Sequence, residues 1–277
     1  MAGRTFQYAE LNASELAALD PARTIVLMAL SPLEVHGPHL PIGCDAIIAQ
    51  ELQRRLLPRL AERYPDYDRL VLPTVYAGAD TIPVPGSLNV DSRAIYYLLL
   101  SIGRSLAEQG FRYLLLTDNH GGPRHQIAIE KAVRKVYKER RFHVIAPFLN
   151  FYRRMVENDP ALLEATGTGP GSSGDVTDAH AGRNETSLML ATAPDEVAPG
   201  WRSLPWVVVG RGAVARGLVT GAKVTYVGEP RMASAEAGER MLEAHVEEGL
   251  AQLERAMRGE PPHSLPLLWG LRWVERS

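Results

Sequence analysis

The residues best suited to chemistry lie in one short segment near the N-terminus, residues 34–45. It reads Glu-Val-His-Gly-Pro-His-Leu-Pro-Ile-Gly-Cys-Asp and directly follows the apolar run 24–30. Its glycines and prolines exclude a regular helix or strand. Carboxylate and imidazole groups in this mixture are ligands that suit Zn, Mn or Fe. We therefore predict a metal site in a loop after a buried strand; a chance cluster of polar residues on a surface loop is the alternative.

Two further segments carry histidine or glutamate beside regular structure. His120 follows the apolar run 111–117 and precedes a predicted helix, which is where open α/β sheets place their ligands. His180 and Glu185 lie at the polar start of a predicted buried helix. Taken singly, Glu185 could be a first-turn carboxylate favoured by the helix dipole, and His180 an exposed loop histidine. The first two segments each follow a strand, so we expect them to meet at one edge of a sheet. The third occurs beside two other His/carboxylate clusters, which argues against the plain readings of His180 and Glu185 holding together.

Three motifs, in this order, resemble those of the creatininase family, which comprises creatinine amidohydrolase and its relatives. They are E-V-H-G-P-H-L-P at 34–41 followed by Asp45, N-H-G-G at 119–122, and H-A-G-R-N-E-T-S at 180–187. The Pro-Gly-Ser tripeptide at 85–87 resembles a loop of the same family. The resemblance spans about residues 20–260, and the first motif is the specific one.

The resemblance implies a binuclear site that holds two divalent metal ions, Zn, Mn or Fe. By position, four ligands carry over, with the aspartate bridging the two ions: Glu34, His36, Asp45 and His120. The creatinine-cleaving member takes a further ligand from a glutamate two residues after the matching histidine, where this chain has Gly122. We assign that role to Glu185. The resemblance also implies His180 as general acid–base, and four residues that support the ligands or touch the substrate: His39, Ser87, Gly121 and Asp178.

The function implied is hydrolysis of a C–N bond in a small, cyclic amide by a metal-bridging water. Gly122 and the lack of tryptophan in residues 150–179 argue against creatinine itself. Two alternatives stay open. The first is a creatininase-like hydrolase of another bond, the C–C bond of a cyclic ketone or a peptide bond. The second is a degenerate, non-catalytic module that binds a small molecule.

Bulk properties agree with a cytoplasmic enzyme that acts on a small molecule. The net charge of −2 gives no electrostatic reason to bind nucleic acid or an anionic membrane. We expect no secretory signal and no transmembrane helix, because no apolar run approaches about 20 residues. Cys44 is the only cysteine, which excludes an intrachain disulfide and favours a reducing compartment. We interpret it as a small buried hydrophobe rather than a nucleophile or ligand.

Apolar periodicity predicts alternating strands and helices, and hence a single three-layer α/β/α domain over residues 1–277 with a mainly parallel sheet. Pro58 is expected to kink or shorten the first long helix. The predicted strands are 24–30, 69–75, 111–117 and 143–148, and the predicted helices are 46–64, 92–109, 124–139 and 232–258.

Two segments outside this alternation have their own predicted roles. The glycine-rich stretch 166–179 is either an active-site flap or a plain linker. The tail 261–277 concentrates leucine and tryptophan, so we expect it to dock on the body or on a neighbouring subunit. With the family resemblance, which implies a hexamer, this tail predicts a homo-oligomer.

Overall fold

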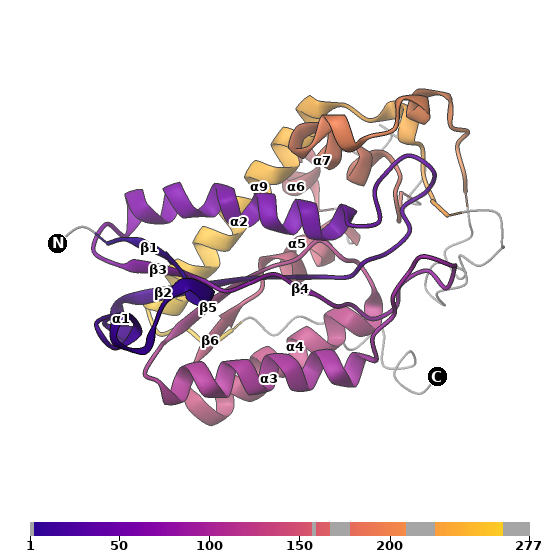
Figure 1. Ribbon diagram of the computed structural model, residues 1–277. Helices are drawn as coiled ribbons and strands as arrows, with labels where there is room; N and C mark the ends of the chain where they lie inside the picture. Colours follow the sequence, from indigo (N-terminus) through magenta and orange to yellow (C-terminus); the bar gives the residue numbers. More distant parts are fainter. Residues whose placement is uncertain (1–2, 157–158, 167–177, 209–224, 263–277) are drawn as a thin grey trace.

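The computed structural model describes residues 3–156, 159–166, 178–208 and 225–262. Within them, parallel strands form a six-stranded sheet in the order β1-β3-β2-β5-β6, and β4 pairs with the end of β2 (Figure 1). The strands are β1 (Thr5–Gln7), β2 (Thr24–Ser31), β3 (Asp68–Val71), β4 (Val75–Tyr76), β5 (Tyr113–Thr117) and β6 (His143–Ile145).

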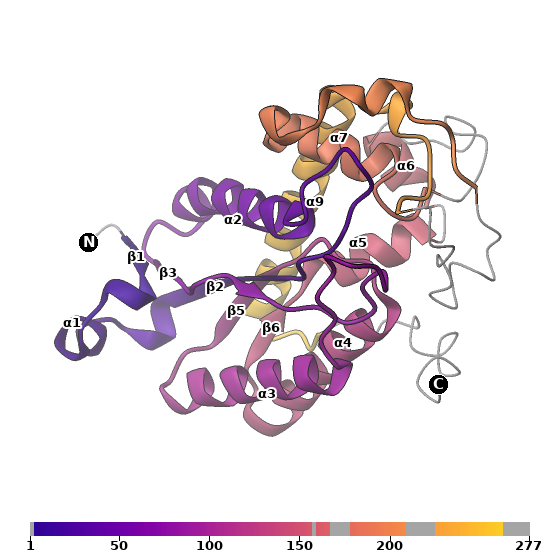
Figure 2. The same ribbon diagram turned by 45° about the vertical axis from the view of Figure 1, so that its right-hand side comes forward.

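Helices cover both faces of this sheet. On one face lie α3 (Ser92–Glu108) and α4 (Pro123–Arg140), and on the other lie α2 (Cys44–Arg63) and α9 (Ala235–Met257) (Figure 1). Three shorter helices pack on α9: α5 (Pro147–Val156), α6 (Pro160–Thr166) and α7 (Arg183–Thr192) (Figure 2). The remaining described helices are short: α1 (Ala13–Ala17), η1 (Tyr8–Glu10), η2 (Pro21–Arg23), η3 (Pro194–Glu196), η4 (Pro199–Ser203) and η5 (Pro230–Met232).

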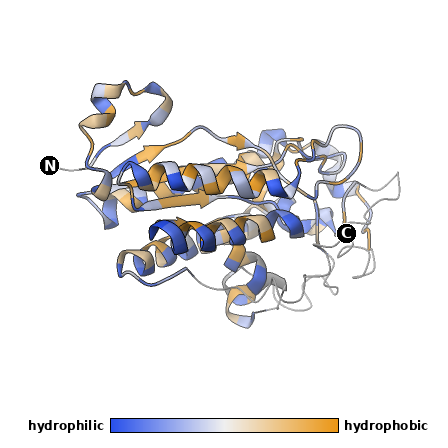
Figure 3. Ribbon diagram, turned by 90° about the horizontal axis from the view of Figure 1, so that it is seen from below, coloured by the Kyte–Doolittle hydropathy of each residue, from blue (hydrophilic) through white to orange (hydrophobic). Residues whose placement is uncertain are grey.

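The central strand β2 shows why the sequence folds into three layers. All eight of its residues are buried. Successive side chains of a strand point to opposite faces. Accordingly, Val26 and Met28 pack with α3 and α4, whereas Ile25 and Leu27 pack with α2 and α9. Colouring by hydropathy shows largely apolar strands behind helices that carry both polar and apolar residues (Figure 3). The predicted three-layer α/β/α fold is thereby confirmed.

Several predicted boundaries were wrong for local reasons. The strand predicted at 69–75 is two short strands, because Pro73 between them has no N–H to donate to a ladder. The strand predicted at 143–148 ends at Ile145, and Pro147 begins α5. Pro58 does not shorten α2, which runs on to Arg63. Burial of α2 against the sheet outweighs the backbone hydrogen bond that Pro58 cannot make. Strand β1, with three residues, was too short to predict.

The topology places two polar loops at the same edge of the sheet. β2 and β5 are neighbouring parallel strands, so their carboxyl ends lie side by side. The segment 34–45 follows the first, and His120 follows the second. This edge is where parallel α/β sheets bind ligands.

Some predictions fall largely outside the described residues. Residues 167–177 of the predicted flap 166–179 lie outside the described residues. Residues 263–277 of the predicted tail 261–277 also lie outside them. Among the helices that the structure describes, none is long and apolar enough to cross a bilayer.

The crossing of α7 and α9 provides a stability test. A Cβ at Gly238 of α9 would lie 1.9 Å from the backbone oxygen of Ser187 in α7. Alanine ordinarily stabilises a helix by about 1 kcal/mol relative to glycine. We nevertheless expect Gly238→Ala to lower the free energy of unfolding by about 1–3 kcal/mol, because the two helices must separate. Denaturant unfolding measures this change. In the control Gly200→Ala the new methyl group meets nothing within 4 Å, so its effect should stay within about 0.5 kcal/mol. Equal stability of the two variants would contradict the close approach.

Candidate metal centre

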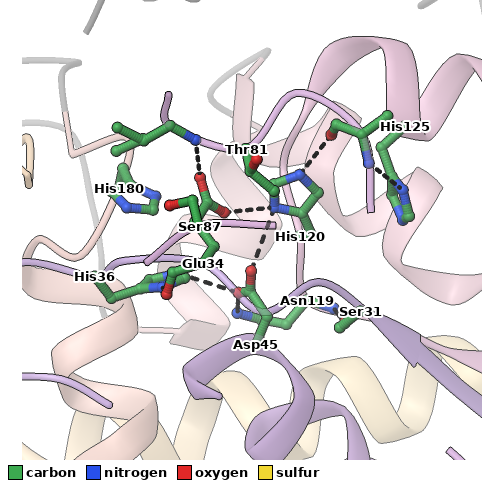
Figure 4. Close-up of polar contacts among 12 residues, drawn as sticks. Ser31, Glu34, His36, Asp45, Thr81, Ser87, Asn119, His120, His125 and His180 are labelled. Carbon is green, nitrogen blue, oxygen red and sulfur yellow. Dashed lines mark hydrogen bonds and ion pairs between the residues drawn. The ribbon is translucent and has the colours of Figure 1, made fainter. Parts of the chain in front are cut away.

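Five predicted ligands converge in the structure. Glu34 and His36 lie in the loop after β2, and Asp45 lies in the first turn of α2. His120 follows β5, and Glu185 is in the first turn of α7. Figure 4 shows the side chains of Glu34, His36, Asp45 and His120 pointing toward one another. Except for Glu185, which is 17% exposed, these side chains are almost completely buried.

The ligands form two clusters that share one aspartate. In the first cluster, His120 Nδ1 lies 3.1 Å from Glu34 Oε2 and 3.3 Å from Asp45 Oδ2. In the second, His36 Nε2 lies 3.5 Å from Asp45 Oδ1 and 3.7 Å from Glu185 Oε2. In each cluster the candidate ligand atoms lie within 4.8 Å of one another. Asp45 thus turns one oxygen to each cluster.

Backbone carbonyls set the orientation of both imidazoles. His36 Nδ1 donates to the carbonyl oxygen of Glu34 at 2.9 Å, and His120 Nε2 donates to that of Ala79 at 2.7 Å. A carbonyl can only accept, so each ring carries its proton on that nitrogen. The other nitrogen of each ring then presents a lone pair to the carboxylates. This is how proteins orient metal-binding histidines.

Three of the candidate ligand atoms have no hydrogen-bond partner in the part of the chain that the structure describes, as expected of atoms that bind a metal ion. Among the described residues, none forms a hydrogen bond with Glu34 Oε2, His36 Nε2 or Asp45 Oδ2. Buried polar atoms without partners are costly, and native structures contain few of them. Glu34 Oε2 and Asp45 Oδ2 belong to the first cluster, and His36 Nε2 belongs to the second. A divalent cation in each cluster would satisfy them.

The charges of the cluster perturb one another strongly. Burial alone would lower the pKa of His36, but Asp45 and Glu185 outweigh it and raise the pKa to about 10. Burial likewise opposes charge on His120, yet Glu34 and Asp45 raise its pKa well above the usual range. Burial raises the pKa of Glu185 to about 8, against the attraction of His36. The site therefore strongly favours positive charge at its centre, whether protons or metal ions supply it.

His180 lies beside these clusters in a different environment. Its ring centroid is 4.3 Å from that of His36, and its Nε2 donates to the carbonyl oxygen of Val35 at 2.8 Å. Burial and the neighbouring His36 lower the pKa of His180 to about 4. The ring is therefore neutral near pH 7, with Nδ1 as its basic atom. One of its nitrogens also lies within 4.8 Å of ligand atoms of Glu34 and His36, so geometry alone also allows it to bind metal.

The predicted supporting residues are placed around this core. Ser87 Oγ accepts the N–H of Val35 at 3.0 Å, which fixes the peptide between Glu34 and Val35, whose carbonyl accepts from His36 Nδ1. His39 Nε2 forms a hydrogen bond with Thr186 Oγ1, at 2.9 Å, beside Glu185. His39 does not join the ligand clusters found among the described residues. Gly121 follows His120 in the same turn and is half-buried.

Asp178 organises the start of α7 rather than the ligand clusters. Its carboxylate accepts the backbone N–H groups of Arg183 and Asn184 at 2.6 and 2.7 Å. Burial raises its pKa to about 6 even though these hydrogen bonds favour the charged form. A Cβ at either Gly182 or Gly228 would lie within 2.0 Å of Asp178 Oδ1, so glycine is required at both positions. Asp178 thereby fixes the turn from which Glu185 projects.

Three contacts around the ligands were not predicted. Asn119 Nδ2 donates to Asp45 Oδ1 at 3.2 Å; its place beside His120 in a motif was the one available signal. The N–H of Ile82 donates to Glu34 Oε1 at 2.5 Å, and the carbonyl of Ala79 accepts from His120. Backbone groups carry no signature in a sequence, so these two contacts could not be found there.

Gly122 is tightly enclosed. A Cβ at this position would lie 2.4 Å from the Ala79 oxygen and 2.5 Å from His120 Nε2. A glutamate here would displace the very contact that orients His120. The structure thus gives a physical reason for glycine, and Glu185 contributes the carboxylate of the second cluster from another direction.

Cys44 is completely buried within the apolar cluster between the sheet and α2. Burial, with smaller contributions from Glu185 and Asp45, raises the pKa of its thiol well above the usual range. The thiol is therefore protonated near pH 7, in agreement with a packing role.

The partly buried cap at Asp178 can be tested against an exposed one. We expect Asp178→Ala to lower the free energy of unfolding by about 1–3 kcal/mol, because two partly buried N–H groups lose their acceptor. Asp91, the exposed N-cap of α3, accepts the N–H of Arg93. After Asp91→Ala that group can bond to water, so the loss should be smaller. Denaturant unfolding of both variants gives the comparison, and a larger loss for Asp91→Ala would contradict the role given to Asp178.

Comparison with known proteins supports one family. The creatininase family profile, described as creatinine amidohydrolase, matches residues 9–253. A mycofactocin precursor peptide peptidase of Mycobacterium ulcerans (strain Agy99) is 29% identical over 262 residues, 89% of this chain and 91% of that protein. A creatinine amidohydrolase of Pseudomonas putida is 27% identical over 200 residues, 68% of this chain and 72% of that protein.

Solved structures agree. A structure described as creatininase with Mn has a TM-score of 0.64 and 25% identity, covering 93% of this chain and 100% of that one. A creatininase mutant described as Zn-Zn type has a TM-score of 0.65 and 25% identity, covering 92% of this chain and 98% of that one. The resemblance seen in the three motifs is confirmed. The chain belongs to the creatininase family of hydrolases.

Proposed function

We propose that this protein is a binuclear metal-dependent hydrolase that cleaves an amide C–N bond. The observation that carries the proposal is the pair of ligand clusters that share Asp45. Five carboxylate and imidazole side chains from four parts of the chain converge in these clusters. Three of their own atoms, Glu34 Oε2, His36 Nε2 and Asp45 Oδ2, have no hydrogen-bond partner among the described residues. A degenerate binding module would have no need to keep this costly arrangement.

The residues sort into two ion positions. Glu34, Asp45 and His120 would hold one divalent ion, and His36, Asp45 and Glu185 would hold the other. Such a pair supplies Lewis acidity for the scissile carbonyl and lowers the pKa of a water so that it can attack near neutral pH. Zn, Mn and Fe all suit these ligands.

His180 is the group proposed to move the proton. Its Nε2 is engaged with the carbonyl of Val35, so Nδ1 is the atom free to accept a proton. With a pKa lowered to about 4, the ring is neutral near pH 7 and can take the proton of the attacking water. It can then donate that proton to the leaving nitrogen, which must be protonated as the C–N bond breaks. Ser87 holds the N–H of Val35, the residue whose carbonyl contacts His180.

The substrate class has two candidates. A small, cyclic amide follows from the motif resemblance, with creatinine disfavoured because Gly122 leaves no room for a glutamate. A peptide is the second candidate, and the observation that favours it is the similarity to precursor peptide peptidases over 89% of the chain. Both share the amide C–N bond and the same proton requirement.

A cytoplasmic homo-oligomer, with a hexamer expected from the family resemblance, stays a prediction. The apolar tail that supports it lies beyond residue 262, outside the described residues.

We expect purified protein to contain about two divalent ions per chain. Asp45→Asn should lose both ions because both clusters use its carboxylate, whereas Glu185→Gln should lose one. Elemental analysis after growth with Zn and Mn measures the content. Less than one ion in the unaltered protein would contradict the binuclear site, and two ions in Glu185→Gln would remove Glu185 as a ligand.

We expect His180→Ala to keep both ions and to lose about 10²–10⁴-fold in turnover, the usual effect of removing a positioned acid–base group. Turnover is measured on a panel of cyclic amides, formamides, short peptides and cyclic ketones, which also identifies the substrate class. Loss of metal in this variant would make His180 a ligand. Cleavage of only the ketones would contradict C–N hydrolysis.

A further inference from the structure

One short loop contacts two ligands of the same cluster. The carbonyl of Ala79 accepts from His120 Nε2 at 2.7 Å, and the N–H of Ile82 donates to Glu34 Oε1 at 2.5 Å. Both partners belong to the cluster of Glu34, Asp45 and His120. The position of residues 79–82 therefore sets the direction in which two of its three ligands point.

A buried histidine holds this loop from behind. His125 lies in the first turn of α4 and has no exposed surface. Its Nδ1 accepts the N–H of Ala79 at 3.3 Å (Figure 4). The Ala79 residue is thus held at both of its backbone polar groups, by His125 on the N–H and by His120 on the carbonyl. Because Nδ1 accepts, the ring proton is on Nε2, which lies 3.3 Å from Asp118 Oδ2.

Asp118 connects the same histidine to the strand end that carries His120. Its Oδ1 accepts the backbone N–H of His120 at 3.0 Å and the hydroxyl of Ser31 at 2.8 Å. Gln126 Nε2 donates to Asp118 Oδ2 at 2.7 Å. The carboxylate is therefore fixed by β2, by the turn after β5 and by α4. His125 bridges this rigid group to the loop at 79–82.

We propose that His125 is a positioning residue for the ion position formed by Glu34, Asp45 and His120. It acts through Ala79: by accepting that N–H it holds the loop whose carbonyl orients His120 and whose Ile82 N–H orients Glu34. None of the hydrogen bonds described for this loop reaches His36 or Glu185, so the effect should be confined to one of the two ions. This inference rests on the proposed metal centre.

Two substitutions separate the hydrogen bond from simple packing. In His125→Asn the side-chain oxygen can occupy the place of Nδ1 and still accept the N–H of Ala79. In His125→Gln the amide reaches toward the place of Nε2 beside Asp118 Oδ2, while the Ala79 N–H loses its acceptor. Glutamine is larger than asparagine, so if His125 only fills space, His125→Gln should bind Zn²⁺ more tightly than His125→Asn. If His125 positions the loop, His125→Asn should bind Zn²⁺ more tightly.

The measurement is the affinity of metal-stripped protein for Zn²⁺, titrated in competition with a chelating dye. Two binding steps are expected in the unaltered protein. His125→Gln should weaken one step by about 10–100-fold, the usual cost of losing a group that supports a metal ligand, and leave the other unchanged. His125→Asn should restore most of that loss. The same pair in a Glu185→Gln background, where only the affected position is expected to bind, assigns the weakened step.

His143→Gln is the matched control, because His143 is also a buried histidine but packs against Tyr113 and Tyr137, away from the ligands. It should leave both steps unchanged. Two unaltered steps in His125→Gln would overturn the inference while leaving the metal centre intact, and so would an Asn variant as weak as the Gln variant. A protein that binds no Zn²⁺ even before substitution would overturn the proposed function itself, and with it this inference. Circular dichroism confirms that each variant is folded.

Discussion

The main constraint on this structure is the burial of a cluster of charged carboxylate and imidazole side chains. Asp45 has no exposed surface, and the carboxylates and imidazoles around it are almost as deeply buried. Moving such groups out of water is strongly unfavourable unless opposite charge and hydrogen bonds compensate. Here His36 and His120 hold the pKa of Asp45 well below its usual value against the effect of burial, and the amide of Asn119 donates a hydrogen bond to the same carboxylate. Metal ions between the clusters would complete it.

The parallel sheet makes this concentration of charge feasible. Two neighbouring strands end at the same edge, so loops far apart in sequence deliver ligands to one place. The helices then fix those loops: Asp45 lies in the first turn of α2, and Glu185 lies in the first turn of α7. The carboxylate of Asp178 caps that turn of α7, and the close approach of Gly238 to Ser187 holds α7 against α9. Apolar packing at some distance from the site therefore contributes to the placement of its charged groups.

The two ligand clusters have different supports. The position of Glu34 and His120 is held by backbone groups of the loop at 79–82. The position of His36 and Glu185 depends on the turn before α7, where Ala181 donates its N–H to Glu185. A change in one support need not disturb the other. Gly122 is enclosed by Ala79 and His120 and has no room for a side chain. The carboxylate of the second cluster is that of Glu185 in α7.

The sequence pattern by itself determined the fold class, and the resemblance of its three motifs to the creatininase family indicated the five converging side chains. Period-two and period-3.6 apolar patterns persist over whole elements, so the alternation of strands and helices was readable, and polar residues at strand ends marked the edge of the sheet. The predicted boundaries of strands were wrong where a proline interrupts the strand, as at Pro73. A strand of three residues, such as β1, repeats the pattern too few times to be predicted. These are local signals, and they are informative only where several residues repeat them.

Tertiary structure alone decided how those side chains are held. That Asp45 turns one oxygen to each cluster, that His120 is oriented by Ala79, and that Asp178 caps α7 depend on contacts across the chain. Most of these partners are backbone N–H and C=O groups, which every residue but proline carries, so no residue type announces them. His125 is a case in point: its sequence position in a helix suggests nothing, and only the folded chain brings it to the N–H of Ala79.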